Sequence, residues 1–222
     1  RGHLEEIELK INMKKTSLSF EFFPPKTEGG ITNLRETRQK LAVFKPEFFS
    51  VTFGAGGSTR DRTMDTVFEI QDEGYQAAPH ISCISSSKAE IVELLKAYQE
   101  KDIKRLVVLR GDVPSGEVST GDFKYAVDLV AFIRQETGDW FHIEVAAYPE
   151  FHPEARSAAD DIDNLKRKVD AGADSAITQY FYNVDAYFQF LESCYKAGIR
   201  VPIVPGIMPI YNYTQLARFS GI

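Results

Sequence analysis

The stretch Leu18-Ser19-Phe20-Glu21-Phe22-Phe23, followed by Pro24-Pro25, is the first of the segments that decide the fold. Its length and aromatic content predict a buried strand, and the two prolines end it because proline cannot donate to a strand ladder. Glu21 lies inside this apolar run, where burial of an unpaired carboxylate is costly. Two interpretations stay open: an acid whose pKa burial raises, or a glutamate that is paired with an arginine or tilted into solvent.

Six further segments have the same short, apolar, β-rich character: Phe48–Phe53, Ala77–Cys83, Arg105–Gly111, His142–Tyr148, Ser175–Phe181 and Pro202–Ile207. Successive segments start 30, 29, 28, 37, 33 and 27 residues apart, which is the spacing of βα units. The intervals carry helical patterns, with a capping box predicted from Ser87 to Glu90. Gly74, Gly172 and Gly198 stand where helices should end.

Strands that alternate with helices predict a parallel sheet covered by helices. A doubly wound sheet and a (β/α)8 barrel both fit this pattern, but the near-uniform spacing and the lack of Gly-x-Gly-x-x-Gly after the first strand favour the barrel. We therefore predict an α/β TIM-type barrel over residues 17–222, preceded by a variable leader at 1–16. Since seven strands would leave unpaired edges, we expect this barrel to be truncated after its seventh strand.

Composition narrows the class of protein. The chain has 222 residues, a net charge of −6 and 43% hydrophobic residues, which is typical of a soluble globular protein. It has no basic cluster for nucleic acid, no apolar stretch of the roughly 18 residues that span a membrane, and no signal peptide. Cys83 and Cys194 fall in different predicted elements, which indicates a reducing cytoplasm. His80 and Cys83 would point to opposite faces of a strand, so we expect no metal site.

Polar residues stand at the carboxyl ends of six predicted strands, where barrels of this class carry their active sites. They are Glu21, Thr52, His80, Arg110 with Asp112, Tyr148 and Gln179. Strand ends meet water in any barrel, but six in succession favour a functional site. A long Gly- and Pro-containing loop at 111–121 agrees with this, whereas the Gly-rich loop at 54–59 is only a weak anion-binding signal.

Other polar and aromatic residues carry less information by themselves. Asp161, Asn164 and Lys168 share one face of a predicted helix, and their spacing favours a solvated charged surface. His152 is indistinguishable from a surface histidine, and Tyr213 and Phe219 are more often core or rim aromatics than ligand contacts.

Taken together, the ordered motifs from about residue 17 to residue 222 resemble the methylenetetrahydrofolate reductase family. The matching stretches are Ser19–Pro25, Val51–Thr63, Ala78–His80, Leu109–Asp112, Ala146–Glu154, Leu165–Ala173, Ile177–Phe181 and Pro205–Pro209.

The resemblance implies a non-covalent FAD across the carboxyl-terminal mouth of the barrel. The residues that match the flavin and ribityl site are Thr52, His80, Leu109, Arg110, Gly111, Asp112, Ala146, Tyr148 and His152. Those that match the pyrophosphate and adenosine site are Asp161, Asn164, Arg167 and Lys168, a reversal of what their spacing alone suggests.

The implied reaction is the ping-pong reduction of 5,10-methylenetetrahydrofolate to 5-methyltetrahydrofolate by NADH or NADPH, with Glu21 as general acid and Asp112 as a second catalytic residue. The residues that match the folate site are Glu21, Asp112, Gln179, Gln215 and Phe219. The sequence does not distinguish NADH from NADPH, and we expect a homo-oligomer. The alternatives are a catalytically inactive barrel and a flavin-free pterin-binding barrel such as a methyltransferase.

Overall fold

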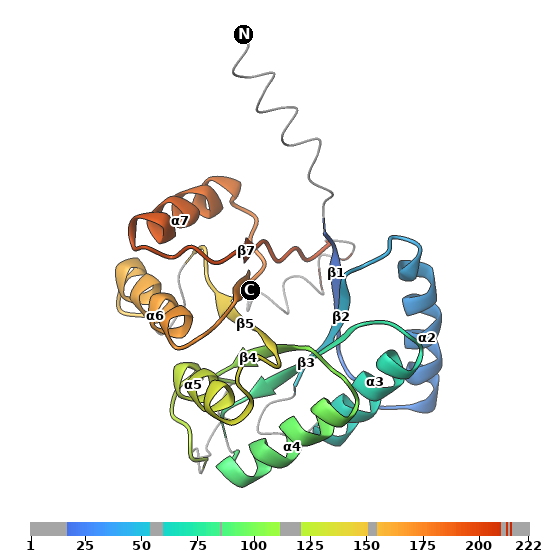
Figure 1. The fold of residues 1–222 in the computed structure, drawn as a ribbon. Helices are drawn as coiled ribbons and strands as arrows, with labels where there is room; N and C mark the ends of the chain where they lie inside the picture. The colour runs from blue at the N-terminus through green and yellow to red at the C-terminus, as the bar shows by residue number, and fades with distance from the viewer. Residues whose placement is uncertain are drawn as a thin grey trace, which may run out of the picture.

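The computed structural model describes residues 17–53, 60–84, 86–111, 121–150 and 155–209, together with Asn212 and Thr214 (Figure 1). The predicted loops at 54–59 and 112–120 and most of the predicted last helix lie outside these residues. Seven strands and six helices alternate along the described chain. This order matches the βα pattern that the spacing predicts.

The strands are short and the helices have 12 to 15 residues. The strands are β1 (Ser19–Phe22), β2 (Phe48–Val51), β3 (Ala77–Ser82), β4 (Arg105–Leu109), β5 (His142–Ala147), β6 (Ser175–Thr178) and β7 (Ile203–Val204). The helices are α2 (Glu28–Ala42), α3 (Arg60–Asp72), α4 (Lys88–Glu100), α5 (Ala126–Thr137), α6 (Ala158–Asp170) and α7 (Val184–Lys196). Each strand lies inside its predicted range but ends earlier. β7 is the shortest, because Pro202 and Pro205 flank it and cannot donate to the ladder.

All neighbouring strands pair in parallel, in the order β1-β2-β3-β4-β5-β6-β7. The sheet curls, and the helices lie on its outer side (Figure 1). Among the described residues, β1 and β7 are the two edges, so the sheet is a curled barrel of seven strands and is not closed. The prediction of a TIM-type α/β fold with fewer than eight strands is confirmed.

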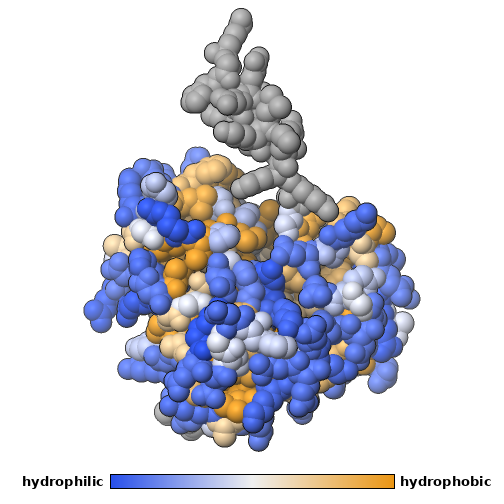
Figure 2. Space-filling view, viewed as in Figure 1, coloured by the Kyte–Doolittle hydropathy of each residue, from blue (hydrophilic) through white to orange (hydrophobic). Residues whose placement is uncertain are grey.

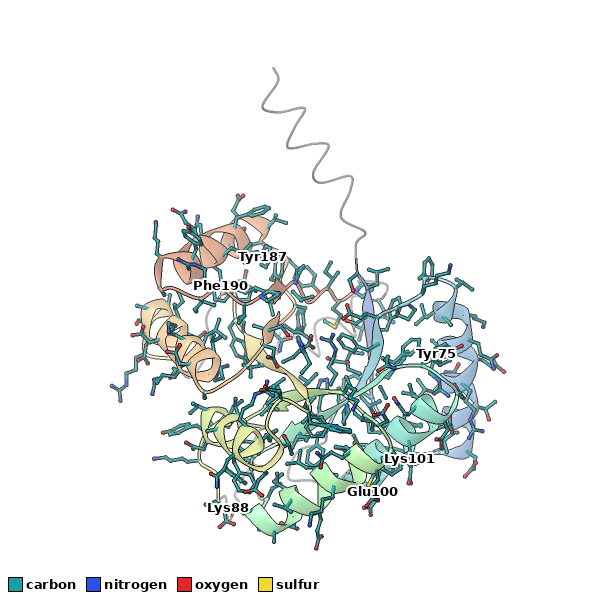
Figure 3. The ribbon with its side chains drawn as sticks, viewed as in Figure 1. Tyr75, Lys88, Glu100, Lys101, Tyr187 and Phe190 are labelled. Carbon is teal, nitrogen blue, oxygen red and sulfur yellow. The ribbon has the colours of Figure 1, made fainter. Side chains whose placement is uncertain are left out.

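The two faces of the sheet differ in chemistry. On the outer face, Phe20 and Phe22 stack on Phe49. The Phe49 ring also meets Tyr75, which Figure 3 labels, edge-on at a centroid distance of 5.4 Å. Because strand side chains alternate between faces, Glu21 projects from the inner face. The apolar core thus lies between sheet and helices, and the inner face carries polar side chains among apolar ones.

Local signals place the helices as predicted. The Ser87 hydroxyl accepts from the backbone N–H of Glu90, and the Glu90 carboxylate accepts from that of Ser87, which forms the predicted capping box. Gly74, Gly172 and Gly198 have φ angles of +85°, +116° and +80°, just after helices α3, α6 and α7. Glycine adopts this left-handed conformation without strain, so all three end their helices as expected.

The last described helix, α7, contacts the sheet with one side and solvent with the other. Tyr187 and Phe190 project from α7 toward the sheet (Figure 3), and the Tyr187 hydroxyl donates to the carbonyl of Ile203 at 3.2 Å. Val184 and Phe188 are exposed, and Figure 2 shows hydrophobic residues among the hydrophilic ones over this part of the surface. Within the described ranges, no helix is both long enough and apolar enough to cross a membrane.

Candidate active site

Glu21 and His80 approach each other at the mouth of the curled sheet. Glu21 comes from β1 and His80 from β3, with β2 between them. The carboxylate atom Oε2 of Glu21 lies 3.5 Å from Nε2 of His80. The structure therefore brings together two of the polar strand-end residues that the sequence singles out.

Glu21 combines features of two of the interpretations that the sequence leaves open. Its side chain is 54% exposed, which agrees with the alternative of a glutamate tilted into solvent, because Glu21 lies on an edge strand of the described sheet. An arginine partner is also absent, since His80 is its one ion-pair neighbour among the described residues. The surrounding protein nonetheless raises the pKa of Glu21 above its ordinary value, because it removes part of the hydration of the carboxylate.

His80 is a buried, neutral histidine. It is 5% exposed, and its Nε2 atom is buried without a hydrogen-bond partner among the described residues. Burial lowers the pKa of His80 to about 4, because the imidazolium would lose its hydration. At neutral pH, His80 therefore contributes a polar N–H or a lone pair beside Glu21 and no charge.

Buried polar side chains fix the backbone where several strands end. The Thr63 hydroxyl donates to the carbonyl of Thr52 at 2.9 Å, and the Ser82 hydroxyl donates to that of Arg110 at 2.8 Å. The Thr178 hydroxyl accepts from the N–H of Gly206 at 2.9 Å. Ser82 and Thr178 stand beside predicted strand ends, which was a usable signal in the sequence, whereas Thr63 lies in α3 and offered none.

The turn after β4 leaves no room for a side chain at Gly111. Gly111 has a φ angle of +82°, and a Cβ atom there would lie 1.9 Å from the Ser82 hydroxyl oxygen. Three groups donate to the preceding Arg110 carbonyl: the Ser82 hydroxyl, the Cys83 thiol and the N–H of Ile84. These contacts hold the backbone at Arg110 and Gly111 in place.

Helix α6 brings a cation to the end of β5. The Nζ atom of Lys168 donates to the carbonyl of Ala146 at 2.5 Å, and burial lowers the pKa of Lys168 to about 8, opposed by the nearby Asp161. Asn164 accepts a hydrogen bond from Arg167 on the same helix. The expectation of a solvated face, drawn from spacing, is wrong for Lys168, because this side of α6 turns toward the sheet.

The remaining predicted site residues divide into two groups. Thr52, Leu109, Arg110, Tyr148 and Gln179 lie at or just after strand ends, and Gln179 is exposed with its side-chain oxygen accepting from the N–H of Tyr180. The predicted site residues Asp112, His152, Gln215 and Phe219, and the aromatic Tyr213, lie outside the described residues. The described residues contain no cluster of three metal-ligating side chains.

A second polar cluster, which the sequence analysis missed, lies toward the amino ends of the strands. Arg105 pairs with Glu144 at 2.7 Å and with Glu47 at 2.5 Å. The Ser175 hydroxyl donates to Glu144 at 3.2 Å and lies 2.7 Å from Nε2 of His142. Each member looks like an ordinary strand residue in the sequence, and only the pairing of β4, β5 and β6 reveals the cluster.

The fold and the mouth together define a class of protein: a parallel α/β barrel with a candidate acid at the carboxyl ends of its strands. Solved structures with this fold include a protein from Clostridium thermocellum, described as binding two copies of 5-methyl-5,6,7,8-tetrahydrofolic acid, with a TM-score of 0.66 and 18% identity over 97% of this chain and 75% of that one. A 2,3-dimethylmalate lyase has a TM-score of 0.59 and 9% identity, over 98% of this chain and 84% of its own.

The family follows from sequence comparison. The model of the methylenetetrahydrofolate reductase family matches residues 6–222. The 5,10-methylenetetrahydrofolate reductases of Pectobacterium carotovorum and Escherichia coli are 46% and 45% identical to this chain, over 98% and 99% of it and 70% and 71% of their own lengths. An Arabidopsis thaliana enzyme named methylenetetrahydrofolate reductase (NADH) 1 is 40% identical, over 98% of this chain and 39% of its own. The chain belongs to the methylenetetrahydrofolate reductase family.

Proposed function

We propose that this protein reduces 5,10-methylenetetrahydrofolate to 5-methyltetrahydrofolate with NADH or NADPH as hydride donor, in a ping-pong reaction that uses FAD. Membership of the family supports an oxidoreductase that acts on methylenetetrahydrofolate. The fold shared with a protein described as binding a methylated folate agrees with this substrate. The observation that carries the mechanism is Glu21, an acid with a raised pKa that opens into the mouth of the barrel.

The described residues fit the cofactor. Lys168 and Arg167 lie on the helix that faces the end of β5, and cations suit a pyrophosphate because charge-assisted bonds to phosphate are strong. A phosphate beside Lys168 would also offset the burial that lowers its pKa. Gly111 keeps the backbone after β4 free of a side chain. When bound, FAD would supply hydride transfer from the nicotinamide to the folate.

Glu21 would hold and deliver the proton that opens the folate ring. The departing ring nitrogen needs a proton before the carbon can become an iminium that accepts hydride. A carboxyl group can donate near neutral pH when its pKa is raised, and the surroundings of Glu21 raise it. The open side of Glu21 faces solvent at the mouth, so a substrate could reach it.

We assign the remaining roles by resemblance. Asp112 would contact the pterin as the second catalytic residue and, as a nearby negative charge, would help keep Glu21 protonated. Gln179, Gln215 and Phe219 would hold the folate or the nicotinamide. We also propose that the protein is cytoplasmic and homo-oligomeric, with one barrel domain over residues 17–222. Both cysteines are free and buried, which suits a reducing compartment.

Anaerobic mixing tests this function. Purified protein reconstituted with FAD is mixed with NADH or NADPH while the visible flavin absorbance is recorded, and methylenetetrahydrofolate is then added. We expect the absorbance to bleach and then to return as folate is reduced. Bleaching without recovery would contradict folate reduction, and a protein that takes up no FAD would favour the inactive or flavin-free alternatives.

A further inference from the structure

Among the described residues, few groups near Glu21 could support its charge. Its neighbour in register on β2 is Ser50, and the next residue in the same row on β3 is Ala78, both uncharged. His80, two residues further along β3, is the one titratable side chain within ion-pair distance among the described residues. Val107, the partner of His80 on β4, is apolar.

A general acid places two opposing demands on such a neighbour. An arginine or lysine beside Glu21 would hold it ionised and remove the proton that it must donate. With no donor nearby, the carboxylate left after proton transfer would be poorly supported once ligands cover the mouth. A neutral N–H donor meets both demands, because it supports the carboxylate without a positive charge.

We propose that His80 is a positioning residue for Glu21, and that its Nε2–H donates a hydrogen bond to Oε2 of the carboxylate that remains when Glu21 has given its proton to the substrate. The proton then leaves from Oε1, the oxygen that faces away from His80. This inference rests on the proposed function, since it concerns the acid of that reaction.

Three observations favour this arrangement. The 3.5 Å separation of the two atoms is just beyond a good hydrogen bond, as is common in unliganded active sites. Nε2 is buried and has no hydrogen-bond partner among the described residues, which is costly unless a partner comes into reach. His80 is neutral at working pH because its surroundings exclude the charged form.

A direct test follows the Glu21 carboxyl by carbon-13 NMR in the full chain without flavin, during a pH titration. Comparison with Glu21→Gln assigns the signal, and Glu144 is the internal control. We expect His80→Phe to raise the midpoint of Glu21 by about one pH unit, because the carboxylate loses a donor, and to leave Glu144 unchanged. An unchanged Glu21 midpoint in a folded His80→Phe protein would overturn the proposal.

A kinetic test compares the two half-reactions in FAD-loaded protein. Removing one preorganised donor typically costs about 100-fold in rate. We therefore expect His80→Phe to slow flavin recovery by methylenetetrahydrofolate about 100-fold more than it slows bleaching by NADH or NADPH. His80→Gln keeps an N–H donor and should recover at least about ten-fold of that loss. Equal losses in both half-reactions, or equal losses in both variants, would contradict a positioning role.

The two tests separate this inference from the proposed function. A shifted Glu21 midpoint in a protein that never reduces folate would leave the His80 contact standing and remove the proposed reaction. Folate reduction with an unshifted Glu21 midpoint and no difference between the two His80 variants would support the proposed reaction and remove the His80 contact.

Discussion

Two glutamates on the inner face of the sheet, Glu21 in β1 and Glu144 in β5, have different surroundings. Both have a raised pKa with burial as the largest cause, although Arg105 and Ser175 oppose it at Glu144. Glu144 is 2% exposed and bound to these two residues. Glu21 is 54% exposed, and neutral His80 is its one ion-pair neighbour within the part of the chain that the structure describes.

The difference indicates what each carboxyl group can do. A buried carboxylate held by an arginine is committed to that pair, and its loss disturbs folding because the partner keeps an unpaired charge. A carboxyl group with a raised pKa and no cation beside it can keep a proton and release it to a ligand. The sequence leaves open that Glu21 is a glutamate paired with an arginine. In the structure, that description applies to Glu144.

The largest effect should come from removing the acid at the mouth. Glu21→Gln cannot donate a proton, so we expect folate reduction to fall by about 10²–10⁴-fold relative to flavin reduction by NADH or NADPH. Stopped-flow absorbance measures both half-reactions. Glu144→Gln, examined under conditions where it remains folded, is the control and should not show this selective loss. Substantial folate turnover by Glu21→Gln would remove its role as acid.

The next effect concerns stability at the other cluster. Arg105→Met leaves Glu144 buried without its cation, and we expect the free energy of unfolding to fall by about 3–5 kcal/mol. Urea denaturation followed by circular dichroism measures this change. Glu21→Gln, in the same assay, should change stability far less. Similar losses in the two variants would show that the two glutamates are equally structural.

The buried histidine at the mouth should make the protein sensitive to acid. The pKa of His80 falls from an ordinary 6.5 to about 4 on folding, so the unfolded chain binds more protons between these values. The contribution of His80 to the free energy of unfolding is fully present above pH 6.5. It decreases as the pH falls, by about 3 kcal/mol at pH 4. Urea denaturation from pH 7 to 4 should give a flatter profile for His80→Gln than for the unmodified protein, and parallel profiles would contradict this.

The smallest of these effects concerns the turn after β4. Gly111→Ala should cost about 2 kcal/mol or more, because it adds a side chain both to a positive φ and to the space of the Ser82 hydroxyl. Gly74→Ala is the matched control, since Gly74 has a similar φ of +85° and no atom within 4 Å of its Cβ position. Chemical denaturation should show the greater loss for Gly111→Ala, and Ser82→Ala should relieve part of it. Equal losses would mean that backbone strain alone matters.

The sequence was sufficient for the fold because its βα spacing, prolines and glycines act locally. Pro24 and Pro25 end the first strand and Gly74 ends a helix regardless of distant contacts. The predicted strands extended past the observed ends. At β7 this happened because Pro205, which cannot donate to the ladder, ends the strand at Val204.

The site was only partly predictable because it depends on contacts across strands. Glu21 and His80 stood out as polar strand-end residues, but their approach skips β2 and follows from the curl of the sheet. Spacing placed Lys168 on a polar helix face and could not show that this face turns toward Ala146. The Arg105–Glu144 pair was equally hidden, since 39 residues separate its members.

The pH dependence of the folate half-reaction tests the role of Glu21 most directly. In a single turnover with FAD-loaded protein already bleached by NADH or NADPH, the rate of flavin recovery by methylenetetrahydrofolate is measured across pH. The protonated carboxyl group is the active form, so the rate should fall as the pH rises through the raised pKa of Glu21. Glu21→Gln should lose this pH-dependent limb together with most of the rate. A limb that persists unchanged in Glu21→Gln would show that the proton comes from another group.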